Sequence, residues 1–169
     1  MHNTTHNRSI NVHFTWMGPW EKANLSALKS LLYKKDSSGN QQISILLWVQ
    51  KESQVKAMQA FSEYASHLTV HSIEESPYYT GENKLILELW EDYSAWTAMK
   101  DFWSFVLMAH HPGYCNYHLD SSGSFSADAI ERLVDDAASP YSKCIGKVYT
   151  KVPFIYLEKS SILRPIITL

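Results

Sequence analysis

A carboxylate, several hydroxyls and a histidine gather in residues 116–123, NYHLDSSG. Tyr117, His118 and Leu119 alternate as in a short strand, and Asp120 stands where that strand breaks into Ser-Ser-Gly. In an open α/β sheet, ligands bind at the rim formed by the carboxyl ends of the strands. We therefore expect Asp120 to be the centre of a site, the alternative being a strand-end acid that caps the next turn.

Three runs of β-branched, aliphatic and aromatic residues predict the strands that would form such a rim, at residues 10–17, 43–49 and 68–73. The middle run, ISILLWV, is almost wholly apolar, as in a strand buried on both faces of a parallel sheet. Helical periodicity separates the runs: one helix follows Asn24, which can cap it, and another spans about 53–67. The order βαβαβ predicts a doubly wound α/β sheet.

The spacing of apolar residues also predicts which helix faces point inward. For the first helix these residues are Leu25, Leu28, Leu31 and Leu32. For the second they are Val55, Met58, Ala60, Phe61 and Ala65. Further along, residues 83–111 predict two helices that meet near 91–94, the second of which covers the sheet. A last helix is expected at 126–138, capped by Ser126, and strands or a hairpin at 144–152 and 154–157.

Composition limits the classes of function. With 169 residues, 45% of them hydrophobic, we expect a single domain at 10–169 after a flexible leader at 1–9. The formal net charge of −2 provides no basic field for nucleic acid or an anionic membrane. The N-terminus lacks the apolar core of a signal peptide, and no apolar run approaches a membrane span. We expect a soluble protein, cytoplasmic or secreted without a classical signal peptide.

Several familiar sites are missing from the sequence. It contains no glycine-rich phosphate loop and no G-x-S-x-G elbow. Cys115 and Cys144 are expected to be reduced thiols. His110, His111 and His118 lie near Cys115, but their spacing fits no zinc signature. The aromatic residues between 90 and 105 are expected to belong to the core.

Four short segments together resemble one enzyme family. Residues 12–18, VHFTWMG, and 45–49, ILLWV, resemble the first two strands of the glycosyltransferases with a DXD sugar-nucleotide motif, a group that includes the large clostridial glucosylating toxins. Residues 98–101, AMKD, resemble the family's Ala-x-Ser-Asp, and residues 117–122, YHLDSS, stand where it has Tyr-Leu-Asp-x-Asp. The segments occur in the family's order at comparable spacing.

The resemblance implies a GT-A-type, Rossmann-like sheet with helices on both faces, a UDP-sugar donor and a divalent cation, manganese or magnesium. Trp16 would stack on the uracil, with Phe14 and Tyr117 also in the nucleotide site. Asp101 would bind sugar hydroxyls, and Asp120 would reach the ribose or the metal. A hard cation needs oxygen ligands and neutralises the diphosphate leaving group.

Two positions depart from the family's pattern. Ser122 replaces the second Asp of the motif, and would be the second metal ligand beside Asp120. Ser104 stands where the family has an Arg facing the diphosphate. These changes remove charges that stabilise the transfer. We also expect a shortened C-terminal part, because only about 50 residues follow the motif.

We therefore expect a nucleotide-sugar-dependent glycosyltransferase or a reduced, inactive relative, with an acceptor of unknown class, protein included; a bacterial effector role is compatible with this. The main alternative is a non-catalytic protein-interaction module on a degenerate transferase fold. A third hypothesis is a dimeric α+β barrel of the small monooxygenase type. It requires Leu85 to Trp90 to be a strand, whereas the transferase hypothesis makes this segment helical.

Overall fold

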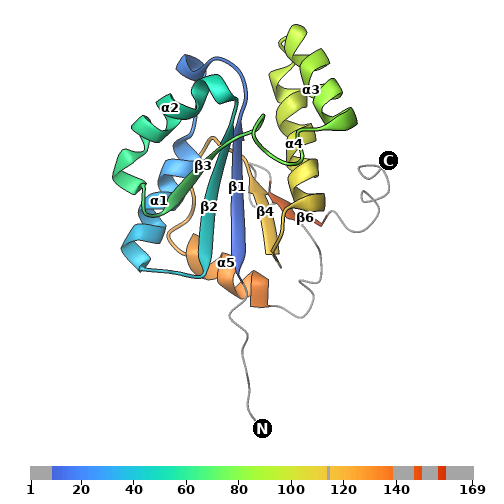
Figure 1. The fold of residues 1–169 in the computed structure, drawn as a ribbon. Coiled ribbons are helices and arrows are strands. Elements are labelled where there is room, and N and C mark those ends of the chain that lie inside the picture. The colour runs from blue at the N-terminus through green and yellow to red at the C-terminus, as the bar shows by residue number, and fades with distance from the viewer. Residues whose placement is uncertain (1–8, 114, 139–146, 150–155, 159–169) are drawn as a thin grey trace.

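The computed structural model describes residues 9–113, 115–138, 147–149 and 156–158. Its centre is one six-stranded sheet in the order β3-β2-β1-β4-β5-β6 (Figure 1). Strands β1 to β5 are parallel and β6 is antiparallel to β5. The strands are β1 (Ile10–Trp16), β2 (Ile43–Val49), β3 (Leu68–Ser72), β4 (Cys115–Leu119), β5 (Lys147–Tyr149) and β6 (Tyr156–Glu158). The predicted α/β, Rossmann-like sheet is confirmed, with the Asp120 strand beside the first strand.

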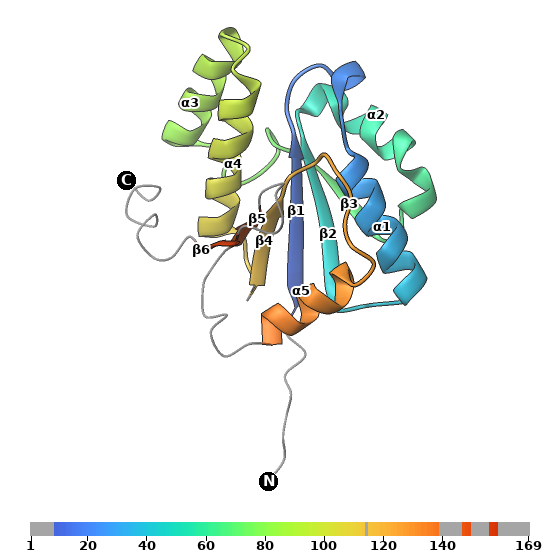
Figure 2. The ribbon, with the colours of Figure 1, turned by 180° about the vertical axis from the view of Figure 1, so that it is seen from behind.

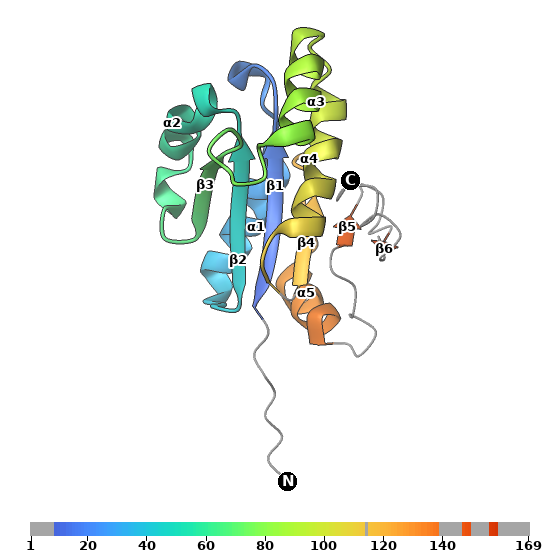
Figure 3. The same ribbon diagram turned by 45° about the vertical axis from the view of Figure 1, so that its right-hand side comes forward.

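Helices cover both faces of the sheet. They are α1 (Ser26–Ser38), α2 (Lys51–Ala60), α3 (Gly81–Asp92), α4 (Trp96–His110) and α5 (Ala129–Ala138), with short 3-10 helices at Trp20–Lys22 and Ser62–Tyr64. Helices α1, α2 and α5 contribute to one apolar core, and Figure 2 shows α1 and α5 in front of the sheet on that side. Helices α3 and α4 form the core of the opposite face, where Figure 3 shows α4 in front of β1 and β4.

Strand β1 separates two different environments because its side chains alternate between the faces. Ile10, Val12 and Phe14 are fully buried in the core under α1 and α5. His13 and Thr15 point to the α4 side and are also buried. The predicted inward leucines of α1 are all buried, as are Ala129, Ile130 and Leu133 of α5. The apolar pattern therefore predicted these two helix faces correctly.

The prediction for α2 was wrong in its bounds and in its inward face. The helix begins at Lys51 and ends at Ala60, before the 3-10 helix at Ser62–Tyr64. Val55 and Met58 are 64% and 56% exposed, and Ala60 and Ala65 are exposed as well. The small residues Ser53 and Ala57 face the sheet instead, and of the predicted set Phe61 alone is buried.

Residues 83–111 form two helices that meet where predicted, between Asp92 and Trp96. The segment Leu85 to Trp90 lies inside α3. The α+β barrel hypothesis, which needs a strand there, is therefore wrong. Among the described residues, no helix is both long and apolar enough to cross a membrane.

Candidate functional site

The order of the strands reverses between β1 and β4. From β1 the chain builds β2 and β3 on one side, then returns through α3 and α4 to place β4 on the other side. Such a reversal leaves a crevice at the carboxyl ends of the two strands, because their connections leave in opposite directions. A pocket of about 260 Å³ lies there, which we call the switch-point pocket. It is lined by Trp16, Met17, Pro19, Lys22, Trp96, Thr97, Lys100 and Ser121.

Two indole rings contribute to the walls of the switch-point pocket. Trp16 ends β1, and Trp96 begins α4. The Nε1–H group of Trp16 is buried and has no hydrogen-bond partner among the described residues. A buried donor without an acceptor is uncommon in a folded protein. Both rings are partly exposed, which leaves aromatic surface for a planar ligand.

Gly18 holds these walls together. Its φ of +107° is one that L side chains rarely adopt, and a Cβ atom there would lie 3.0 Å from Cγ of Trp96. The glycine therefore lets the Trp96 ring pack directly on the backbone that follows β1. The Gly18 amide donates to Oε1 of Gln50 at 2.8 Å, and Nε2 of Gln50 donates to Oε1 of Glu91 at 2.7 Å. The loop after β1 is thus tied to β2 and α3.

The pocket carries positive charge. Lys22 comes from the 3-10 helix after β1, and Lys100 lies one turn after Trp96 in α4. Among the described residues neither ammonium forms an ion pair, whereas Lys51, Lys56 and Lys84 each pair with a glutamate. Two unpaired lysines at one pocket favour an anionic ligand.

The turn after β4 forms the opposite rim. Ser121 is buried, and its carbonyl accepts a hydrogen bond from the Ala27 amide in the first turn of α1. Oδ1 of Asp120 accepts one from the Ser122 amide at 3.4 Å. The Gly123 amide donates to Oγ of Ser26 at 2.9 Å. These bonds fix the Asp120 turn against α1, with Asp120 and Ser122 both partly exposed.

The structure brings only some of the predicted site residues to the pocket. Trp16 lines it, and Asp120 and Ser122 flank its lining residue Ser121. Asp101 is exposed on α4, directly after the lining residue Lys100. Of these four residues Trp16 alone lines the pocket, and the others are neighbours in sequence of lining residues, so their roles stay predictions.

Phe14, Tyr117 and Ser104 lie away from the pocket. Phe14 and Tyr117 are fully buried in the core under α1 and α5, and the Tyr117 hydroxyl donates to Asp136 at 2.7 Å. Ser104 is buried in α4, and its hydroxyl donates to the Asp101 carbonyl. None of these three side chains lines the pocket, so they can support a ligand only through the framework.

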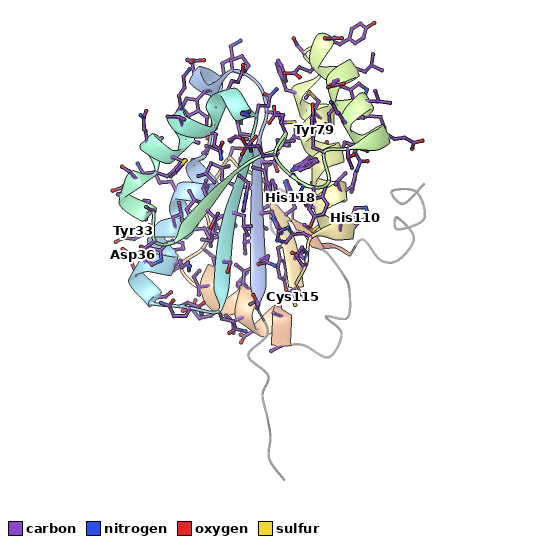
Figure 4. The ribbon with its side chains drawn as sticks, in the orientation of Figure 1. Tyr33, Asp36, Tyr79, His110, Cys115 and His118 are labelled. Atoms are coloured by element: carbon purple, nitrogen blue, oxygen red, sulfur yellow. The ribbon has the colours of Figure 1, made fainter. Side chains whose placement is uncertain are left out.

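A row of buried polar side chains lies on the α4 side of the sheet. Nε1 of Trp48 donates to Nδ1 of His13, so Nε2 of His13 carries the proton and donates to Oδ1 of Asn116 at 3.0 Å. Thr15 bonds to His118 at 3.0 Å, and Figure 4 shows His118 within the sheet and His110 on α4. Burial is the main cause that lowers the pKa of His13 to about 3. His13 is therefore a neutral, hydrogen-bonded part of the core.

The Asp120 turn offers oxygen donors of the kind that magnesium and manganese prefer. It supplies one carboxylate and the hydroxyl of Ser122, and such cations commonly bind through one or two carboxylates together with substrate phosphates. Among the described residues, no three His, Cys, Asp or Glu side chains are grouped to hold a metal. Metal binding by Asp120 and Ser122 therefore stays a prediction, and it would need further ligands from a bound substrate.

Sequence reasoning missed Lys22, Trp96 and Lys100. Lys22 and Lys100 are 78 positions apart in the sequence, so no local motif links them. The one signal was local: Trp96 and Lys100 are four residues apart and therefore share a helix face, close after the break that the sequence predicts near 91–94.

No family model and no curated protein matches this chain. One solved structure to which the chain is similar is titled "PaToxG Glycosyltransferase", with 12% sequence identity and a TM-score of 0.49. The match covers 67% of this chain and 42% of that one, so the chain spans less than half the length of the structure it resembles. A likeness this distant carries no evidence about activity.

Proposed function

We propose that the chain binds a nucleotide sugar in the switch-point pocket, as a glycosyltransferase or a reduced relative of one. The observation that carries the proposal is the pairing of two indole rings with two unpaired lysines at the reversal of the strand order. A nucleoside diphosphate presents the matching chemistry, because its base stacks on an aromatic ring and its phosphates attract cations.

Each pocket residue then has a role that its position supports. Trp16 stacks on the base, because its partly exposed ring lines the pocket. Lys22 and Lys100 attract the diphosphate. They would replace the arginine that faces the diphosphate in the family, where this chain has Ser104. Asp120 reaches the ribose or, with Ser122, a divalent cation that would neutralise the diphosphate. Asp101 binds hydroxyls of the sugar.

Calorimetric titration with UDP tests this proposal. Stacking on one aromatic ring contributes about 1–3 kcal/mol per base, so Trp16→Ala should weaken UDP binding by about 5- to 150-fold. Trp90→Ala is the matched control, because Trp90 lies in α3 and does not line the pocket. Equal affinities in wild type and Trp16→Ala would remove Trp16 from the site, and no binding by the wild type would remove the proposal.

A non-catalytic interaction module is a second proposal, supported by the surface of α3. Leu85, Leu89 and Tyr93 are 65%, 54% and 77% exposed, and Leu85 and Leu89 are spaced to share one face. This proposal gains if UDP fails to bind. It requires that Leu85→Ser with Leu89→Ser abolish capture of a partner protein while leaving the thermal unfolding of the chain unchanged.

A further inference from the structure

A second pocket, of about 360 Å³, lies under the loop that connects β3 to α3. Figure 3 shows this loop crossing the sheet in front of β2. We call this second pocket the histidine pocket. The lining residues used in the argument below are Trp48 of β2, Gln54 of α2, His71 of β3, Ser76 and Tyr78 of the loop, and His111 after α4. It shares no lining residue with the switch-point pocket. Its volume is within the range of small-molecule sites.

Aromatic rings form the inner walls of the histidine pocket. His71 stacks on Trp48 with ring centroids 4.5 Å apart and an interplanar angle of 21°. His111 meets Trp48 edge-on at 6.0 Å and Tyr78 at 6.4 Å. A ligand between these rings meets flat apolar surface on more than one side.

The two imidazoles of this pocket have unused hydrogen-bonding capacity. No ring nitrogen of His71 or His111 bonds to another described residue, and Nδ1 of His111 is buried without a partner. Burial lowers the pKa of both rings, and in His111 the nearby His71 lowers it further. A neutral imidazole has one donor and one acceptor nitrogen, so each ring can pair with a hydroxyl group.

The charge of the histidine pocket differs from that of the switch-point pocket. No lysine or arginine lines it, and its one carboxylate, Glu75, lies 3.3 Å from the ammonium of Lys51. The lining therefore carries no cation of its own, and the nearby Lys51 ammonium is already paired with Glu75. Hydroxyl and amide groups of Ser76 and Gln54 add further donors and acceptors.

We propose that the histidine pocket is a second binding site, for an uncharged pyranose ring. The apolar C–H faces of the ring pack on His71 and Tyr78, and its hydroxyls, which donate and accept, pair with the imidazoles of His71 and His111 and with Gln54. The inference does not depend on nucleotide binding in the switch-point pocket, since the two sites share no residue.

The test titrates the full chain separately with glucose, glucose 6-phosphate, uridine and Zn²⁺. NMR spectra report the binding of each probe. Glucose should shift the indole signal of Trp48, and His71→Ala should weaken its binding about fivefold or more, as expected for loss of a hydrogen bond worth about 1 kcal/mol. Tyr78→Leu, which keeps an apolar side chain but removes the ring, should weaken it in the same direction. His67→Ala, outside the pocket, and Trp16→Ala, in the other pocket, should leave glucose affinity within twofold.

Each other outcome overturns the inference. Tighter binding of glucose 6-phosphate would show that the pocket takes anions. Tighter binding of uridine at Trp48 would make it a base site. A response of His71 and His111 to Zn²⁺ but not to glucose would make it a metal site. Glucose binding that is lost in Trp16→Ala, or no glucose binding at all, would place the sugar elsewhere or nowhere.

Discussion

The two pockets of this protein use the same sheet in opposite ways. The switch-point pocket is built at the strand ends from backbone turns, two indole rings and two unpaired lysines. The histidine pocket lies against the sheet between β2, β3 and a crossing loop, and its titratable rings are held neutral by burial. Two unpaired lysines line the first pocket, whereas the lining of the second carries one carboxylate, Glu75, which is paired with Lys51. The difference shows that the location of a pocket on the fold decides which charges remain available to a ligand.

Acid should act most strongly on the side of the molecule that holds the histidine pocket. The pKa of His13 is lowered from 6.5 to about 3, and those of His71 and His111 are lowered too. Below pH 6.5 these histidines therefore bind protons in the unfolded chain but not in the folded chain. Their contribution to the free energy of unfolding is fully present above pH 6.5 and is lost as the pH falls toward 3. His13 alone should cost up to about 1.4 kcal/mol per pH unit in this window.

Denaturant unfolding between pH 7 and pH 5 measures this loss above the range where ordinary carboxylates titrate. His13→Gln, which cannot gain the proton, should lose less stability over the same interval. A wild-type stability that stays flat from pH 7 to pH 5 would contradict the neutral state of these rings.

Substitution of Gly18 should damage the switch-point pocket specifically. Gly18→Ala forces a Cβ to 3.0 Å from the Trp96 ring at a φ of +107°, whereas Gly123, with a φ of +111°, has no atom within 4 Å of such a Cβ. The two variants share the backbone strain, so their difference isolates the collision. Gly18→Ala should be less stable than Gly123→Ala by about 1–3 kcal/mol in denaturant unfolding. Equal losses would mean that the Trp96 ring moves freely.

These contrasts also explain which parts of the molecule could be predicted. The run at 43–49 is almost wholly apolar, which indicates a strand buried on both faces of a parallel sheet. The run at 10–17 was predictable from its β-branched and aromatic residues, although Asn11, His13 and Thr15 are polar and buried. Helix α2 did not follow its apolar pattern, because it meets the sheet through Ser53 and Ala57 and leaves Val55 and Met58 exposed. The inward face of α2 is the one whose small residues allow close packing on the sheet. Small residues do not produce the periodic apolar pattern from which an inward helix face is predicted.

The candidate site was predictable only where one segment carries it. The Asp120 turn follows β4 and Trp16 is the last residue of β1, and the sequence marks the end of both strands. Lys22 and Lys100 line one pocket although they come from the 3-10 helix after β1 and from α4, so their placement depends on the complete topology. The histidine pocket likewise combines residues from β2, β3 and the end of α4. The sequence contains these histidines but does not show that they lie next to one another.

A carboxylate at Ser122 should distinguish a ligand-binding turn from a structural one. Next to Asp120 it would strengthen manganese binding in the presence of UDP, by about tenfold for one added charge near a divalent cation. In a merely structural turn the two carboxylates would repel, and the loss of stability would remain with both ligands present. Thermal unfolding of wild type and Ser122→Asp, with and without manganese and UDP, separates the two results.

Removal of one lysine should have the smallest effect. Lys100→Ala should weaken UDP binding about fivefold, close to the 1 kcal/mol of a solvent-exposed charge pair, and the difference from wild type should shrink as salt is raised. Lys56→Ala is the control, because Lys56 already pairs with Glu21 outside the pocket. A fivefold loss that persists at high salt would mean that Lys100 acts through packing.

The most direct test of the account asks which pocket a nucleotide enters. In ¹⁵N-labelled protein the indole N–H signals of Trp16, Trp96 and Trp48 can be assigned by single Trp→Phe substitutions and followed during titration with UDP. We expect the Trp16 and Trp96 signals to shift, because both rings line the pocket. The Trp48 signal should stay in place, because Trp48 lies outside this pocket and its Nε1 already donates to His13. Saturable binding that shifts Trp48 and leaves Trp16 and Trp96 unchanged would contradict the account.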